Sequence, residues 1–255
     1  MATYKKRGYK PKTKADKQTA IEEQSATAEV FNTLDEGASK TEEWVVKNQK
    51  YIFVVIGVVA AVVLGYLGYN KFIQEPKEAE AMNDMFQAQQ YFEQAVNGTE
   101  SDSLYVLSLN GGEGQFGMLD IIKNHGGTDA GNLANYYAGV SYLNLKDYQN
   151  AITYLSDFSG EGTALGAISQ GAIGDAFAQL NQNGEALEYY EKAVKSEENE
   201  FTTPMYLFKA GVTAMELSDN GKALTYFNRI KEDFPNSTEA ATIDAFIGKA
   251  EAANN

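Results

Sequence analysis

Hydrophobic and polar residues follow two different patterns along this chain. Residues 51–70 read YIFVVIGVVAAVVLGYLGYN, without one charge, between Lys50 and Lys71. Twenty helical residues reach about 30 Å, the thickness of the hydrocarbon core of a bilayer. From residue 77 to residue 253, apolar residues instead recur at helical spacing among polar ones. The pattern predicts an all-α chain, with a single transmembrane helix followed by a domain of amphipathic helices.

The apolar segment is predicted to be an uncleaved anchor. A buried core helix seldom runs twenty residues without a charge, and a cleaved signal peptide is not preceded by fifty residues. One face carries Gly57, Ala61 and Gly65 at i, i+4 and i+8, a spacing that lets another helix approach closely in lipid. The alternative is that these are only the small residues common in membrane helices.

A repeat of three aligned positions runs through the carboxy-terminal part. Gly139, Gly174 and Gly211 each precede an alanine by twelve residues (Ala151, Ala186 and Ala223), and a large side chain follows four residues later (Leu155, Tyr190 and Phe227). The repeat lengths are close to the roughly 34 residues of tetratricopeptide repeats. The small residues are expected where two antiparallel helices cross. The prediction is a helix-turn-helix solenoid over 77–253, with repeats at about 132–164, 167–199 and 204–236 and a capping helix at 237–253.

The first helix of each tetratricopeptide repeat lines the concave face, which predicts a groove for a partner. By alignment the groove receives Leu133, Tyr136, Val140, Leu143, Ile168, Asp175, Ala178, Met205, Phe208, Val212 and Met215. Such an apolar, Met-containing groove suits an amphipathic helix or an unstructured apolar segment. Tyr136, Val140, Phe208 and Val212 are expected to face the partner rather than the core. The alternative is that the chain's own helix fills the groove through Met82, Met85 and Phe86.

Charge divides the chain in the same way as hydropathy. Of the net charge of −14, residues 1–50 contribute +2 and residues from 71 onward contribute −16. A domain this acidic is a poor candidate for binding nucleic acid or anionic lipid. Residues 1–50 are expected to form a basic, partly disordered tail. Seven of its ten Lys and Arg residues come before residue 18: Lys5, Lys6, Arg7, Lys10, Lys12, Lys14 and Lys17. They predict a cytoplasmic amino terminus, with ribosomal RNA or anionic lipid as candidate ligands, unless the basic run serves only to fix the topology.

Enzymatic chemistry is not predicted. Residues 112–117 (GEGQFG) match the dinucleotide fingerprint G-x-G-x-x-G, but the motif requires a βαβ unit and helices follow, so a loop between helices is expected. His125 is the one histidine, and the chain has no cysteine. No cofactor, metal cluster or catalytic constellation is therefore expected.

The layout resembles one family, the YfgM-like ancillary subunits of the bacterial SecYEG translocon. The resemblance is carried by TEEWVVKNQKYIFVVIG at residues 41–57 and GNLANYYAGVSYLNLKDYQNAITYL at residues 131–155. It implies an inner-membrane protein with a periplasmic repeat domain that binds the translocon and a membrane-anchored periplasmic chaperone, the PpiD-type prolyl isomerase. The expected function is a non-enzymatic scaffold at the translocon. The alternative is a repeat protein that coordinates envelope assembly or cell division.

Overall fold

The structure, a computed structural model, describes residues 14–98 and 101–253, with side chains from residue 42 onward. The chain divides into two compact units, Met1–Tyr69 and Asn70–Asn255. All regular secondary structure in the described ranges is helical, so the predicted all-α fold is confirmed.

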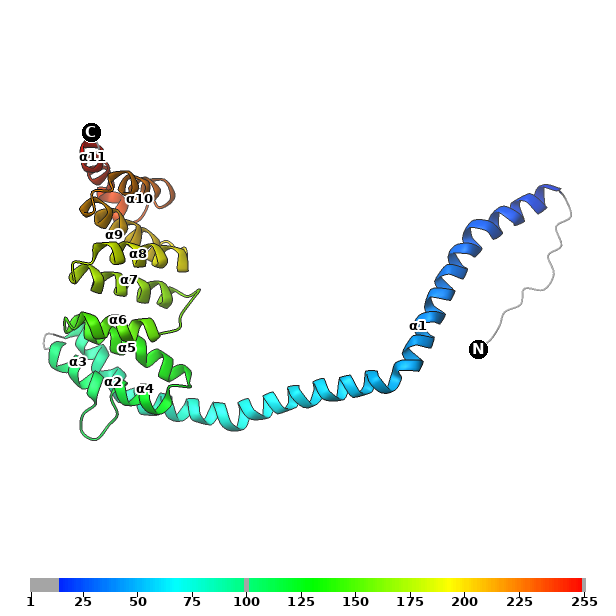
Figure 1. The fold of residues 1–255 in the computed structure, drawn as a ribbon, viewed down its shortest axis with the longest axis horizontal. Coiled ribbons are helices and arrows are strands. Elements are labelled where there is room, and N and C mark those ends of the chain that lie inside the picture. Colours follow the sequence, from blue (N-terminus) through cyan, green and yellow to red (C-terminus); the bar gives the residue numbers. More distant parts are fainter. Residues whose placement is uncertain (1–13, 99–100, 254–255) are drawn as a thin grey trace. The chain divides into compact units, whose positions relative to one another are not determined.

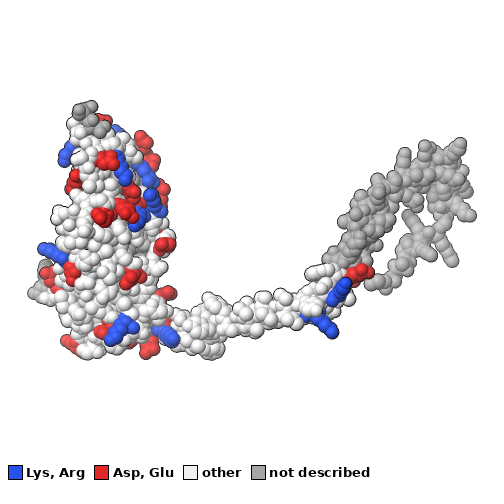
Figure 2. All heavy atoms as spheres, viewed as in Figure 1, with Lys and Arg blue, Asp and Glu red and all other residues white. Residues whose placement is uncertain are grey.

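The first unit contains one long helix, α1 (Lys14–Tyr69). The most apolar window of eighteen residues has a mean hydropathy of 2.5, and none of it is buried. Among the described residues, one continuous helical stretch, Glu42–Asn97, is long and apolar enough to cross a membrane, and its uncharged part falls in α1. Figure 2 shows a long stretch of this helix without Lys, Arg, Asp or Glu, which corresponds to residues 51–69 of the sequence. The helix begins at Lys14, so much of the predicted tail is helical.

The second unit starts with the π-helix η1 (Asn70–Gln74), and the elements that follow are all helices (Figure 1). They are α2 (Glu75–Asn97), α3 (Ser101–Asn110), α4 (Met118–His125), α5 (Asp129–Asn144), α6 (Tyr148–Asp157), α7 (Ala164–Gln179), α8 (Asn183–Ser196), α9 (Thr202–Glu216), α10 (Asn220–Asp233), η2 (Glu239–Thr242) and α11 (Ile243–Ala253). The helices α5 to α10 form three consecutive pairs, which stack in order through contacts of α6 with α7 and of α8 with α9. Each pair begins two or three residues before the predicted repeat.

The repeated glycines lie where the two helices of a pair cross. A Cβ atom at Gly139 would lie 2.5 Å from Leu155 Cγ, one at Gly174 would lie 2.6 Å from Tyr190 Cε1, and one at Gly211 would lie 2.3 Å from Phe227 Cε1. These distances are shorter than any ordinary carbon–carbon contact, so the large residue of each repeat occupies the space that the glycine leaves. The physical reason expected for the repeat spacing is confirmed.

The turns inside the pairs repeat as well. Lys146, Asn181 and Ser218 occupy the equivalent turn position and have φ values of 64°, 57° and 63°. Left-handed backbone at a non-glycine residue is uncommon, and here it recurs once in every pair. The repetition extends from side-chain packing to backbone conformation.

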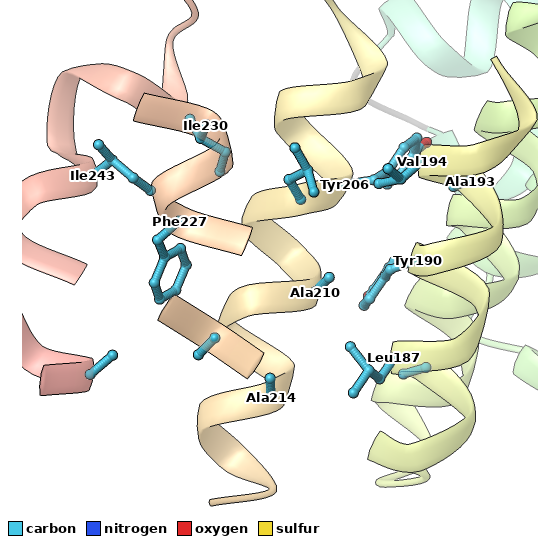
Figure 3. Close-up of a cluster of buried hydrophobic side chains, with 14 of the residues drawn as sticks. Leu187, Tyr190, Ala193, Val194, Tyr206, Ala210, Ala214, Phe227, Ile230 and Ile243 are labelled. Carbon is cyan, nitrogen blue, oxygen red and sulfur yellow. The ribbon is translucent and has the colours of Figure 1, made fainter. Parts of the chain in front are cut away.

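The core continues between the pairs. Figure 3 shows α9, with Tyr206, Ala210 and Ala214, between two layers of buried side chains. Leu187, Tyr190 and Val194 lie on one side, and Phe227, Ile230 and Ile243 lie on the other. Ile243 belongs to α11, which packs against α10. Where one capping helix was predicted at 237–253, the structure has the 3₁₀ turn η2 followed by α11.

Helix α2 is an integral part of the repeat domain. Gln74 Nε2 donates to the Gly127 carbonyl at 3.1 Å. The Glu78 carboxylate accepts from the backbone N–H groups of Asp129 and Ala130 at 2.7 and 2.8 Å, which satisfies free donors at the start of α5. His125 Nε2 lies 2.9 Å from Asp84 Oδ2. These contacts fix α2 against the turn between α4 and α5.

The GEGQFG segment forms a loop between two helices. LYVLSL, which precedes it, belongs to α3 and is not a strand. Two glycines of the motif are explained by the loop backbone: Gly114 has a φ of +80°, and a Cβ atom at Gly117 would lie 2.3 Å from the Leu109 carbonyl oxygen. The expected loop between helices is confirmed.

Candidate partner-binding face

The predicted groove residues lie on α5, α7 and α9, the first helices of the three pairs. We call ten of them the first-helix face. Its members are Leu133, Tyr136, Val140, Leu143, Ile168, Asp175, Met205, Phe208, Val212 and Met215, and each of them is half-buried. Helix α7 contacts both α5 and α9, so the fold brings the three groups of side chains onto neighbouring helices.

Several of these side chains also contribute to packing inside the domain. The Tyr136 ring centroid lies 5.5 Å from that of Phe158, and the Phe208 ring lies edge-on to Phe246 of α11 at 4.7 Å. Val140 and Val212 border buried clusters as well. The expectation that these residues face a partner instead of the core is wrong in that form, because their side chains contact the core as well as the surface.

The alternative occupant, the chain's own α2, covers part of the face on α5, because Leu133 and Val140 pack against clusters that include Met85 and Phe92 of α2. Met85 is fully buried, and it packs with Ala134 and Ala138 of α5. Met82 and Phe86 are 47% and 61% exposed. The apolar pattern correctly placed all three side chains on one helix. Of the three, only Met85 is buried inside the domain.

A polar network crosses the face between α7 and α9. Tyr190 donates its hydroxyl hydrogen to Asp175 Oδ1 at 2.8 Å, and Lys209 Nζ donates to both carboxylate oxygens of Asp175 at 2.7 Å. The ammonium also lies 5.8 Å from the Tyr190 ring centroid and 5.7 Å from that of Tyr206. The pair is about one-third exposed, so it offers one fixed polar point in an otherwise apolar face.

The sequence identifies Asp175 but not its partners. Lys209 and Tyr206 lie next to predicted groove residues on α9, and the repeat pattern predicts only a packing role for Tyr190. Lys209 is the one lysine of α9, and a lysine inside an apolar helix is a signal that a carboxylate lies across from it. The repeat alignment alone does not pair it with Asp175.

The two tyrosines of this network predict a loss of stability in alkali. Burial raises the pKa of Tyr190, and the Asp175 carboxylate raises it further; the same two causes raise the pKa of Tyr206. Above about pH 10 the unfolded chain releases these protons while the folded chain keeps them, so stability falls by about 1.4 kcal/mol per pH unit per tyrosine. Below pH 10 both states hold the protons, and the two groups have no effect.

Urea unfolding of the full chain between pH 8 and pH 11 measures this dependence. The hydroxyl of Tyr206 makes only a 3.5 Å contact with the Ile168 carbonyl, so Tyr206→Phe removes one titrating group at small structural cost. The alkaline slope should become shallower in the variant. An unchanged slope would mean that the phenol ionises as readily in the folded state as in the unfolded state.

A polar cavity of about 610 Å³ lies outside the first-helix face. It is formed between the loop after α6, the start of α7 and the last turns of α8, and Lys192 and Lys195 are among its lining residues. The described residues contain no group of three or more His, Cys, Asp or Glu placed to hold a metal ion. His125, the one histidine, is paired with Asp84.

The other predicted sites lie in the first unit. A Cβ atom at Gly57 or Gly65 would have nothing within 4 Å, and Ala61 is exposed, so this face of α1 is open for another helix and its role stays a prediction. Lys5, Lys6, Arg7, Lys10 and Lys12 lie outside the described residues, as do the side chains of Lys14 and Lys17.

Comparison with known families supports the repeats. Residues 133–159 and residues 172–238 each match a sequence model of the tetratricopeptide repeat. No curated protein and no solved structure matches the chain significantly. Tetratricopeptide repeats generally serve as scaffolds for protein–protein interaction. The stacked helix pairs from α5 to α10 therefore form a tetratricopeptide-repeat domain, preceded in the chain by one candidate membrane helix.

Proposed function

We propose that this chain is a non-enzymatic, membrane-anchored scaffold at the SecYEG translocon of the bacterial inner membrane. In this proposal the amino terminus is cytoplasmic and the repeat domain is periplasmic. The first-helix face binds a PpiD-type chaperone or an emerging polypeptide. The resemblance of the anchor and the first repeat to YfgM-like subunits motivates the choice of partners.

The composition of the first-helix face is the observation that carries the proposal. Eight of its ten members are aliphatic, Met or Phe side chains, half-buried on three neighbouring helices. Such side chains bind the apolar positions of an amphipathic helix or of an unfolded segment. The Asp175–Lys209 pair adds a fixed polar point. It can orient a bound segment whatever the charge of that segment.

The anchor gives this face an advantage that a free domain lacks. A helix held in the same membrane as the translocon confines the domain near chains that emerge there. Confinement raises the effective concentration of the face, to the millimolar range for short tethers, without any new contact. Weak and rapidly reversible binding by the face is then sufficient.

Co-purification tests the proposal. Ile168 is the one apolar member of the face that borders none of the described hydrophobic clusters, so Ile168→Glu places a charge on the face with little effect on packing. When the full chain is purified from membranes solubilised in mild detergent, the chaperone should co-purify, as detected by antibody. The amount of chaperone that co-purifies with the Ile168→Glu variant should be at least tenfold lower. Gln149→Glu, at an exposed position of α6, is the control with the same added charge.

Two outcomes would contradict the proposal. Equal recovery of the chaperone with Ile168→Glu and with Gln149→Glu would exclude the first-helix face as its binding site. Recovery of division or envelope-assembly proteins, with neither SecY nor the chaperone, would favour the alternative function.

A further inference from the structure

Helix α2 has a second apolar face that the domain does not use. Its buried face consists of Ala81, Met85, Ala88, Phe92 and Ala95. On the adjacent side, Met82, Phe86 and Val96 are 47%, 61% and 57% exposed. Neither Met82 nor Phe86 belongs to a hydrophobic cluster of the described residues. Exposed Met and Phe one turn apart on a folded domain indicate an interaction surface.

These side chains belong to a series with the spacing of a helix-pairing seam, in which every position except the half-buried Gln89 is exposed. Residues 79, 82, 86, 89, 93 and 96 are separated alternately by three and four positions, as the a and d positions of a heptad are. Ala79, Met82, Phe86 and Val96 are apolar, and Gln89 donates through Nε2 to Glu93 Oε1 at 3.2 Å. We call these six residues the α2 seam. A seam of this spacing fits one straight partner helix.

Charge decides between the possible occupants of the α2 seam. Helix α2 carries five acidic residues and one lysine, of which Glu78 and Asp84 are engaged inside the domain. The chain from residue 71 onward has a net charge of −16. An anionic membrane surface is therefore repelled. A second copy paired in parallel would bring Glu93 against Glu93 between two acidic domains. A partner helix with basic residues beside its own apolar seam meets neither penalty.

We propose that the α2 seam is a second binding surface, and that it pairs with a basic amphipathic helix of another protein. The surface is distinct from the first-helix face, because Met82 and Phe86 are exposed on α2, whereas the face lies on α5, α7 and α9. The domain then holds two helical or extended partners at once. This inference does not depend on the identity of the partner proposed above.

A designed peptide tests the proposal without a known partner. The probe is a fluorescein-labelled peptide of four heptads with Leu at a and d and Lys at e and g, and its counterpart carries Glu at e and g. The full chain is held in nanodiscs of phosphatidylcholine, and binding is followed by fluorescence anisotropy. The Lys peptide should bind, and the Glu peptide should bind at least tenfold more weakly.

Variants locate the binding. The double variant Met82→Gln, Phe86→Gln should bind the Lys peptide at least tenfold more weakly than the parent chain does. Its thermal unfolding should be unchanged, because glutamine is a good helix former and both positions are exposed. Phe201→Gln alters an aromatic that is 87% exposed outside α2 and should change nothing. Equal binding of both peptides, or equal binding by the double variant, would overturn the proposal. Ile168→Glu should leave the Lys peptide bound, which separates this test from that of the first-helix face.

Single cysteines distinguish the other occupants, because the chain has no cysteine of its own. If oxidation of the Met82→Cys chain gives a disulfide-linked dimer, the α2 seam is an interface between two copies. If an environment-sensitive dye on Phe86→Cys shifts to the blue in anionic vesicles but not in phosphatidylcholine, the surface binds lipid. Either result overturns the proposal, and the absence of both, with selective binding of the Lys peptide, supports it.

Discussion

Replacing Gly211 with leucine should destabilise the repeat domain by about 3 kcal/mol or more. A Cβ atom there would lie 2.3 Å from Phe227 Cε1 and 2.7 Å from Phe227 Cζ, and Phe227 is fully buried. The ring has little room to move aside, because it packs against both Phe208 and Phe246. Overpacking of this kind typically costs about 1–3 kcal/mol and occasionally more. For a domain of this size the midpoint of thermal unfolding should fall by roughly 6 to 12 °C.

Circular dichroism of the full chain measures the midpoint, and a glycine outside the crossings is the control. Gly248 lies inside α11, and a Cβ atom there would have nothing within 4 Å. Gly248→Ala should therefore leave the midpoint unchanged or raise it, since alanine favours helix by about 0.5–1 kcal/mol. A Gly211→Leu midpoint within one degree of the parent would mean that the helices of the third pair do not cross at this residue.

The repeats could be predicted from sequence because their constraint is local and recurrent. Gly139, Gly174 and Gly211 each face a large side chain sixteen residues later, and that spacing is visible without any knowledge of neighbouring repeats. The loop at GEGQFG was also predictable, since no second strand follows it. Periodicity placed Met82, Met85 and Phe86 on a helix, yet it could not tell which would be buried, because α2 is apolar on two adjacent faces.

Contacts between repeats were beyond prediction. The pairing of Asp175 with Lys209 depends on how far α9 is rotated relative to α7, and this rotation cannot be derived from the sequence. The same holds for Glu78, which caps α5 from a helix fifty residues earlier in the chain. Tyr136 and Phe208 were correctly placed on the first helices, but their contacts with Phe158 and Phe246 come from segments outside the repeat consensus.

If residues 51–70 anchor the protein, the whole repeat domain lies on one side of the membrane. The basic tail predicts a cytoplasmic amino terminus, so residues beyond the anchor should be accessible from the periplasm. The cysteine-free chain permits a direct test with one introduced cysteine at a time. Gly8→Cys marks the tail. Gly184→Cys marks the domain at an exposed position where a Cβ atom meets nothing within 4 Å.

Labelling of the two variants with a membrane-impermeant maleimide, in intact spheroplasts and after lysis, is the decisive measurement. The Gly184→Cys chain should be labelled in intact spheroplasts, and the Gly8→Cys chain should be labelled only after lysis. In both variants the protein should stay with the membrane in alkaline carbonate. If the thiol of the Gly184→Cys chain is instead protected until lysis, the domain is cytoplasmic and cannot bind chains that emerge on the periplasmic side. Release of the protein by carbonate would show that residues 51–70 do not span the bilayer.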